Sequence, residues 1–282
     1  LLMSLFFVII IVLGYMFSYV YNAPQILYFA VFFSIAMNVV SYWYSDKIVV
    51  ALSGAREISK EENKELWNIV ENLIITAGLP MPRVYVVDDL APNAFATGRD
   101  KNHAVIAVTT GLLSALNRSE LEGIIAHELS HIGNRDILIS TVVVVLVGFI
   151  VLLSDLFLRM GFLGARRSDN ERGGGGIIVL IGIIFAVFSP IAATLIHLAI
   201  SRKREFLADA SGALLTRYPE GLANALKKIS EYNQPMQKVS NAIAHLYISN
   251  PYGKQKNEIK FFQKMFLTHP PIEDRIKALL GH

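Results

Sequence analysis

The segment IIAHELSHIGNRD, residues 124–136, places two histidines four positions apart, with a glutamate directly after the first. On a helix, His127 and His131 lie one turn apart on the same face, so both imidazoles can reach one ion. Glu128 can then reach a water bound to that ion. This is the H-E-x-x-H pattern of zinc metalloproteases. The alternative is two ordinary surface histidines on an amphipathic helix.

Apolar residues around the motif recur at helical spacing. Ser119 and Glu122 have the spacing of a capping box, and Asn134 is a residue type that can end a helix. The sequence therefore predicts a helix over residues 119–134 that carries the whole motif. The residues that follow the helical spacing are Leu121, Ile124, Ile125, Leu129 and Ile132.

The remaining polar sequence predicts a small α+β domain that is mostly helical. RVYVVD (83–88) and AVIAVT (104–109) are rich in β-branched residues and predict strands. SKEENKELWNIVENLIITAG (59–78) predicts a helix. EFLADASGALLTRY (205–218) and the stretch after Pro219 predict two more.

A catalytic zinc ion usually has three protein ligands and one open position. A third histidine six residues after His131 is excluded, because Ile137 stands there. SRKREFLADA (201–210) offers Glu205 and Asp209, which are again four residues apart. Glu205 can bind the ion, and Asp209 can hold the second nitrogen of a zinc-binding histidine. The alternative for Glu205 is an ion pair with a neighbouring arginine.

Long uncharged blocks predict membrane-spanning helices. Of the 282 residues, 53% are hydrophobic, and the mean hydropathy is +0.45. About 20 apolar residues form a helix that crosses a bilayer. Asp, Glu, Lys and Arg are absent from residues 1–45, 137–154 and 177–201. We therefore predict four spans, near 1–20, 26–44, 137–157 and 177–200.

These spans divide the chain into four parts. Residues 1–45 form two transmembrane helices, and 46–136 form the first part of the protease domain. Residues 137–200 form a transmembrane hairpin with a Gly/Arg-rich loop over 159–176, and 201–282 form the second part of the domain. An even number of spans separates the two halves of the site, so both halves face the same side. The metal should lie just above the membrane surface.

The charge and cysteine content exclude several classes of site. The sequence contains no cysteine, which excludes disulfides and thiolate metal ligands. A net charge of +3 is modest, and the basic residues are scattered or lie beside the spans. We therefore expect no nucleic-acid binding, and a lipid bilayer as the partner of these charges.

Five motifs in a fixed order resemble the M48 family of membrane zinc endopeptidases, and closely its HtpX branch. The resemblance extends over essentially the whole chain, including the four hydrophobic spans. The motifs are NAFATG (93–98), VTTGLL (108–113), HELSHIGNRD (127–136), REFLADA (204–210) and THPPIEDRI (268–276).

The resemblance implies a gluzincin-like zinc protease domain on four transmembrane helices. It implies one Zn²⁺ per subunit, held by His127, His131 and Glu205, with Glu128 as the general base. It also implies that substrate pairs beside Asn93, Ala94 and Phe95, and that His269 lies near the site. The implied substrates are polypeptides, above all damaged or misfolded membrane proteins. The implied location is a cell membrane, with the active site in the cytoplasm.

The reaction also requires a group that stabilises the oxyanion formed from the scissile carbonyl, and His269 and Arg275 are the candidates. Three other functions remain open. A non-catalytic zinc-binding membrane protein would have no use for Glu128. An intramembrane protease would carry its motif inside an apolar span, whereas charged residues flank this motif. A prenyl-protein protease of the same family would need more than four spans.

Overall fold

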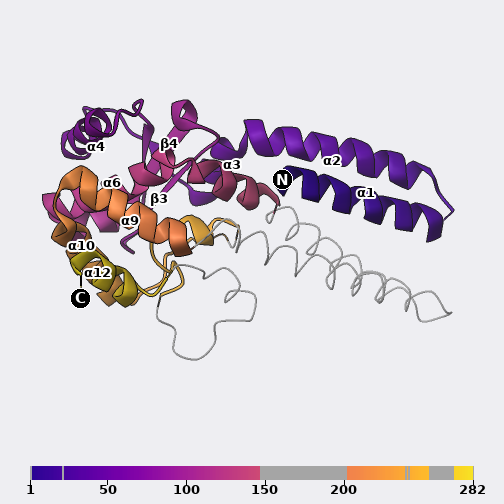
Figure 1. Cartoon of the computed structure of the whole chain (residues 1–282). Coiled ribbons are helices and arrows are strands. Elements are labelled where there is room, and N and C mark those ends of the chain that lie inside the picture. The colour runs from indigo at the N-terminus through magenta and orange to yellow at the C-terminus, as the bar shows by residue number, and fades with distance from the viewer. Residues whose placement is uncertain are drawn as a thin grey trace.

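Helices dominate the part of the chain that the structure describes, which confirms the prediction of a mostly helical α+β protein (Figure 1). The computed structural model describes residues 2–20, 22–146, 202–238, 240, 242–253 and 270–281. Its helices are α1 (Leu2–Val20), α2 (Gln25–Trp43), α3 (Ser45–Ser53), α4 (Lys64–Ala77), α5 (Thr110–Ala115), α6 (Arg118–Gly133), α9 (Arg202–Thr216), α10 (Pro219–Glu231) and α12 (Ile272–Leu280). A further helix, Asp136–Leu146, follows α6.

A mixed four-stranded sheet supports the polar domain. Its strands are β1 (Arg56–Glu57), β2 (Arg83–Val87), β3 (Ala94–Gly98) and β4 (Ala104–Thr109). The strand order is β1-β2-β4-β3, with β2 and β4 parallel and both edge strands antiparallel to their neighbours. The two strands predicted from β-branched sequence are present as β2 and β4. β1 and β3 contain too few β-branched residues to be predicted.

Alternate residues of each strand point to opposite faces of the sheet. Both faces are buried, because each packs against other elements. One face packs on the helices that include α4 and α6, and the other packs on α3 and the segment around Tyr247. The strand residues of the first face are Val84, Val86, Ala94, Ala96, Ala104, Ile106 and Val108. Those of the second are Tyr85, Val87, Phe95, Val105 and Ala107.

Helix α6, which carries the H-E-x-x-H motif, is the central helix of the domain. It packs against α4, α9 and α10, and its side chains Ile124, Ile125 and Leu129 are fully buried. Two glycines allow close helix approach. A Cβ on Gly123 would lie 2.7 Å from the Leu222 backbone nitrogen in α10. A Cβ on Gly212 of α9 would lie 3.0 Å from the backbone nitrogen of the first motif histidine.

The start of α6 differs from the prediction. Asn117, not Ser119, is the N-cap, and Glu120, not Glu122, closes the capping box. Asn117 has an extended backbone, and its Oδ1 accepts from the Glu120 N–H at 3.0 Å, while the Glu120 carboxylate accepts from the Asn117 N–H at 2.8 Å. Glu122 instead pairs with Arg118 at the helix start. The predicted end is confirmed, because Asn134 is the C-cap.

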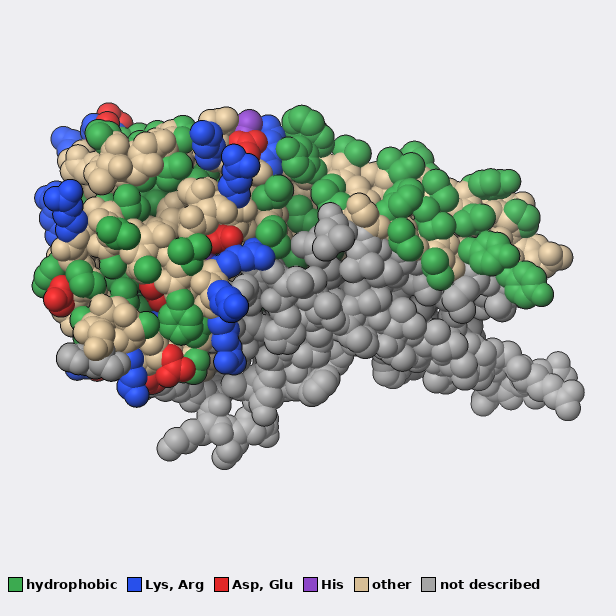
Figure 2. Space-filling model, viewed as in Figure 1, with side chains coloured by type: hydrophobic (Ala, Val, Ile, Leu, Met, Phe, Trp, Pro, Cys, Tyr) green, Lys and Arg blue, Asp and Glu red, His purple; other side chains and the backbone are tan. Residues whose placement is uncertain are grey.

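The apolar N-terminal helices form a pair that extends away from the sheet (Figure 1). Helix α2 is long and apolar enough to cross a membrane, the one such helix among the described residues when each is taken singly. A Cβ on Gly14 of α1 would lie 2.4 Å from the Ala30 Cβ of α2, so the two helices pack closely. Hydrophobic side chains cover this pair, whereas charged side chains gather over the polar domain (Figure 2).

The chain turns sharply between the motif helix and the next apolar segment. α6 and helix Asp136–Leu146 meet at an angle of 84°, and Arg135 between them has a positive φ of 62°. The pair together passes the length and apolarity test for a span, but α6 lies in the core of the polar domain. The predicted spans near 137–157 and 177–200 fall mostly in residues 147–201, outside the described residues.

Candidate metal centre

Three side chains that the sequence predicts as metal ligands meet between α6 and α9. One ligand atom from each of His127, His131 and Glu205 lies within 4.8 Å of the others. The two histidine Nε2 atoms are 3.2 Å apart. Oxygens of Glu205 lie 3.9 Å from His127 Nε2 and 3.5 Å from His131 Nε2.

This spacing fits a tetrahedral zinc ion. Ligand atoms at the usual zinc distances of about 2.0–2.2 Å, in tetrahedral arrangement, lie roughly 3.3–3.6 Å from one another. The 3.2, 3.5 and 3.9 Å separations bracket that range. Two imidazoles and one carboxylate therefore already stand in positions from which they could hold one small ion, with a fourth position left for water.

Asp209 and Arg275 form a buried support behind the first histidine. Asp209 Oδ1 lies 2.9 Å from His127 Nδ1, one helical turn from Glu205 as the sequence suggests. The Arg275 guanidinium donates two hydrogen bonds to the same carboxylate, Nε to Oδ2 at 2.9 Å and Nη2 to Oδ1 at 2.7 Å. Arg275 is 0% exposed. Because both Asp209 oxygens accept from Arg275, the carboxylate is fixed in the plane that meets the imidazole.

Asp136 gives the second histidine a similar partner, which the sequence analysis did not identify. Its Oδ2 lies 3.2 Å from His131 Nδ1. The contact depends on the turn between α6 and helix Asp136–Leu146, which brings a residue five positions along the chain back to the imidazole. A sequence spacing of five does not share a helix face, so no helical pattern signals this pair.

The site has a strongly uneven electrostatic environment. Burial and the charge of Arg275 lower the pKa of His127 to about 4. Burial alone would lower the pKa of His131, but its contact with Asp136 and the charge of Glu205 raise it to about 9. Burial likewise opposes ionisation of Asp209, yet its hydrogen bonds from Arg275 lower its pKa to about 2. Near neutral pH, His127 is therefore neutral and Asp209 is charged.

A cavity of ≈ 30 Å³ adjoins the three ligand side chains. Roughly 10–15 Å³ is enough for one water molecule. Glu128, 2% exposed, lines this cavity together with Ala96 of β3 and His245. No sequence pattern indicates a role for Ala96 or His245 at the metal centre. Ala96 lies within the NAFATG motif that contains the expected substrate residues, and that motif was the available signal.

The three residues expected to contact substrate do not line the cavity, which only Ala96 of β3 reaches, and their side chains are buried. Asn93 accepts from the Ser249 backbone nitrogen at 3.2 Å and donates to its carbonyl at 3.1 Å. The Ala94 carbonyl accepts from the Ile248 nitrogen at 3.0 Å. Phe95 packs edge-on against Tyr247, on the far face of the sheet.

Of the two candidates for stabilising the oxyanion, Arg275 is among the described residues and His269 is not. Arg275 is held on Asp209 and is not among the residues that line the cavity, but its guanidinium also lies 3.4 Å from His127 Nε2 and 3.9 Å from Glu205 Oε2. His269 lies outside the described residues.

Comparison with known proteins identifies the family. Residues 60–282 match Peptidase family M48. The chain is 48% identical to the Protease HtpX homolog of Thermoanaerobacter pseudethanolicus over 279 residues, 97% of this chain and 91% of the relative. It is 51% identical to the Protease HtpX homolog of Pyrococcus furiosus over 245 residues, 86% of this chain and 82% of the relative.

The fold also resembles the crystal structure of S. mikatae Ste24p, with a TM-score of 0.52 and 19% sequence identity. The match covers 96% of this chain but 62% of the Ste24p chain, and it concerns the fold alone. The family model matches most of the chain, and the relatives are about half identical to it. Together these matches assign the sequence to a family. The chain belongs to peptidase family M48 and is a metalloprotease of that family.

Proposed function

We propose that the chain is a membrane-anchored zinc endopeptidase, with zinc held by His127, His131 and Glu205 and with Glu128 as the general base. The observation that carries the proposal is the position of Glu128 in the same small cavity as the three converging ligand side chains. The Glu128 carboxylate can act as a general base there, because a water held in that cavity would be within reach of both the ion and the carboxylate.

The buried charges support a divalent ion. The carboxylates of Glu128, Glu205 and Asp209 are 2–4% exposed. The Arg275 guanidinium beside them is fully buried. An uncompensated buried charge is costly, so an ion of charge +2 stabilises the group. Two imidazoles and a carboxylate form a usual ligand set for catalytic zinc.

The protein groups divide the work of peptide hydrolysis. When bound, zinc acidifies a water and polarises the scissile carbonyl. The Glu128 carboxylate accepts the proton of the attacking water and later delivers it to the leaving amine. Asp209 and Asp136 accept the Nδ1 protons of the two histidines, so each imidazole keeps Nε2 free for the ion.

We propose that the substrate backbone lies along β3, the edge strand nearest the metal centre. β3 pairs with β4 on one side, and Ala96 lines the cavity on the other. An edge strand offers unpaired N–H and C=O groups to an extended peptide. In this arrangement Asn93, Ala94 and Phe95 fix the strand, and the contact to substrate is made by the Ala96 backbone.

The oxyanion donor and Arg275 have separate proposed roles. His269 remains the donor that the sequence suggests, and His245 in the cavity wall is a second candidate. Arg275 is proposed as a positioning residue, because it holds the Asp209 carboxylate that contacts His127 Nδ1 and itself lies 3.4 Å from the His127 ring nitrogens.

Membrane topology and biological role complete the proposal. We propose four spans, with the domains 1–45, 46–136, 137–200 and 201–282 arranged as the sequence predicts and the active site in the cytoplasm. The relatives named Protease HtpX homolog support proteolysis. We propose damaged or misfolded membrane proteins as the substrates, as the resemblance to the HtpX branch implies.

Glu128→Gln tests the proposal most directly. The variant should keep its zinc, because all three ligands remain, and should lose at least about 10²–10⁴-fold in casein cleavage, because an amide cannot accept the water proton. Metal content and cleavage are measured on the same purified protein. Glu122→Gln is the matched control, since Glu122 lies on the same helix and pairs with Arg118 at the surface. Substantial cleavage by metal-loaded Glu128→Gln would refute the assignment.

A further inference from the structure

A second pocket, of ≈ 610 Å³, lies where α2 meets the polar domain, and it shares no lining residue with the metal-centre cavity. We call it the interface pocket. Val39 and Trp43 line it from the last turns of α2, and they are 50% and 52% exposed. The end of a membrane span marks the level at which lipid chains give way to head groups, where Trp is enriched. The interface pocket therefore opens at the depth of the lipid phosphates.

The charges that line the interface pocket favour an anion. Lys47, Arg83 and Arg99 contribute three cations, and Asp46 contributes the carboxylate. Arg83 is already engaged, because its Nη2 lies 2.6 Å from Asp46 Oδ2. Lys47 is exposed, and its ammonium lies 5.5 Å from the centre of the Tyr44 ring. Among the described residues no carboxylate pairs with Lys47, so its charge is available to a ligand.

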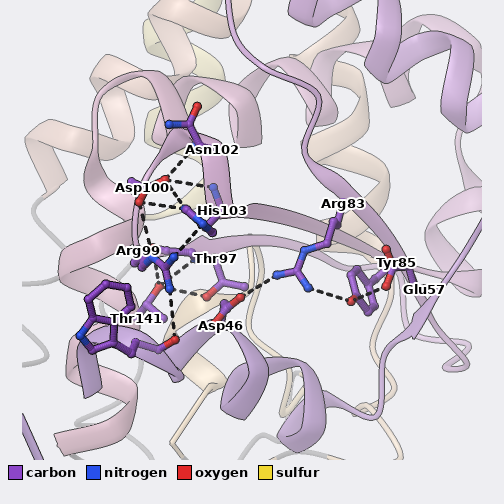
Figure 3. Close-up of polar contacts among 12 residues, drawn as sticks. Asp46, Glu57, Arg83, Tyr85, Thr97, Arg99, Asp100, Asn102, His103 and Thr141 are labelled. Carbon is purple, nitrogen blue, oxygen red and sulfur yellow. Dashed lines mark hydrogen bonds and ion pairs between the residues drawn. The ribbon is translucent and has the colours of Figure 1, made fainter. Parts of the chain in front are cut away.

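Arg99 is fixed in place by its neighbours (Figure 3). Its Nη2 lies 2.7 Å from His103 Nε2, and because a guanidinium can only donate, Nε2 is the acceptor. The His103 proton is then on Nδ1, which lies 2.8 Å from Asp100 Oδ1. Arg99 Nε lies 3.6 Å from Asp100 Oδ2, so that carboxylate already balances part of the Arg99 charge. On its other side, Arg99 donates to the Trp43 carbonyl at 3.3 Å, and its guanidinium lies 4.7 Å from the centre of the Trp43 ring.

We infer that the interface pocket binds the phosphate of an anionic phospholipid. A guanidinium that is already oriented binds a phosphate with two hydrogen bonds, and a nearby ammonium adds a point charge. Arg99 and Lys47 supply these two groups. Val39 and Trp43 continue the lining towards the membrane, which suits the glycerol and acyl portion of a lipid better than a free phosphate ion. The inference rests on the proposal that α2 spans the membrane, but not on the proposed chemistry of the metal centre.

Lipid competition tests the inference. The full-length protein, purified in neutral detergent, is mixed with equal amounts of phosphatidylglycerol and phosphatidylcholine, and bound lipid is counted by native mass spectrometry. The wild type should prefer phosphatidylglycerol. Lys47→Gln should reduce that preference about fivefold, the usual effect of one basic residue near an anionic surface. Lys60→Gln is the matched control, because Lys60 is an exposed lysine of the polar domain paired with Glu71.

A second variant guards against misfolding. Arg99 also contacts Trp43, so Arg99→Gln could loosen the end of α2, whereas Arg99→Lys keeps the charge and loses the two-point contact. Arg99→Lys should unfold near the wild-type temperature and still lose phosphatidylglycerol preference. An unchanged preference in both Lys47→Gln and Arg99→Lys would overturn the inference. So would displacement of the lipid by an equal concentration of glycerol phosphate, which would identify a free-phosphate site.

The same samples separate this inference from the proposed function. Casein cleavage and zinc content of Lys47→Gln in detergent should equal those of the wild type, because the interface pocket and the metal centre share no residue. If the wild type also lacks cleavage, the proposed function is wrong. The lipid inference is still decided by the measured preference for phosphatidylglycerol.

Discussion

Glu205 and Asp209 lie one turn apart on α9, yet they make different contacts. Glu205 faces the Nε2 atoms of both histidines, whereas Asp209 contacts Nδ1 of His127 from behind. We expect Glu205→Ala to lose zinc and activity together, because a ligand is removed. Asp209→Asn should keep zinc but bind it about 10–100-fold more weakly, as loss of a histidine's orienting partner does.

Competition with a calibrated chelator measures both affinities. Glu220→Ala is the control, since Glu220 is an exposed carboxylate on the neighbouring helix α10. Zinc held by Glu205→Ala as tightly as by the wild type would place the third ligand elsewhere.

The two ligand histidines should differ in proton release on zinc binding. His131, with its pKa raised to about 9, is protonated in the metal-free protein at pH 6, whereas His127, with its pKa lowered to about 4, is already neutral. Zinc binding at pH 6 should therefore release about one proton, not two, and affinity should fall as the pH is lowered below 9. Calorimetric titrations in buffers of different ionisation enthalpy count the protons. Release of none would contradict the assigned charge state of His131.

Individual site residues were predictable wherever a helical spacing linked them. His127 with His131, and Glu205 with Asp209, are pairs four residues apart, and each pair lies as that spacing suggests. Asp136, Ala96 and His245 could not be predicted. Asp136 reaches the site through the turn after α6, Ala96 through the edge strand β3, and His245 from a segment distant in sequence. Local periodicity in the sequence does not indicate such contacts.

At the scale of elements, the position of Glu205 depends on how closely α9 approaches α6. Gly212 makes that approach possible, since a Cβ there would lie 3.0 Å from the His127 backbone nitrogen. Gly212→Val should push the two ligand-bearing helices apart. A displacement of about 1 Å in an active site can cost 10²-fold in rate, so we expect a comparable loss in kcat/KM.

Gly133→Ala provides the contrast. Gly133 lies on α6, and a Cβ there would meet Leu79 Cδ1 at an ordinary 3.9 Å. Its kcat/KM and melting temperature should stay near those of the wild type. Equal activity of Gly212→Val and Gly133→Ala would show that helix spacing does not control the site.

Helices were easier to predict than strands in this chain. The helix around the motif follows apolar periodicity, and the structure contains it as α6. The two helices predicted after residue 204 are present as α9 and α10. β1 has two residues, and β3 reads AFATG, so neither shows a strand pattern. They form because β2 and β4 present edges to them, which is a tertiary effect.

For the whole molecule, the proposed topology makes the loop over 159–176 and the polar domain face opposite sides of the membrane. These 282 residues contain no cysteine, so a single thiol introduced into them reports its own location. Ser168→Cys should react with a membrane-impermeant maleimide outside intact cells. Thr76→Cys, at an exposed position on α4, should react only after lysis. Reaction of both from outside would exclude the proposed hairpin, and the reverse pattern would invert the orientation.

The order of the ligands along the chain has a consequence for how the enzyme is made. His127 and His131 leave the ribosome first, while Glu205, Asp209 and Arg275 follow only after the apolar stretch over 137–200. Arg275 comes later in the sequence than all three ligands, and its guanidinium holds the carboxylate that orients the first histidine. During translation, therefore, the nascent protease carries a base without a finished ion site. The nascent chain becomes able to cut only after Arg275 has been made, which spares the segments that are still folding before that point.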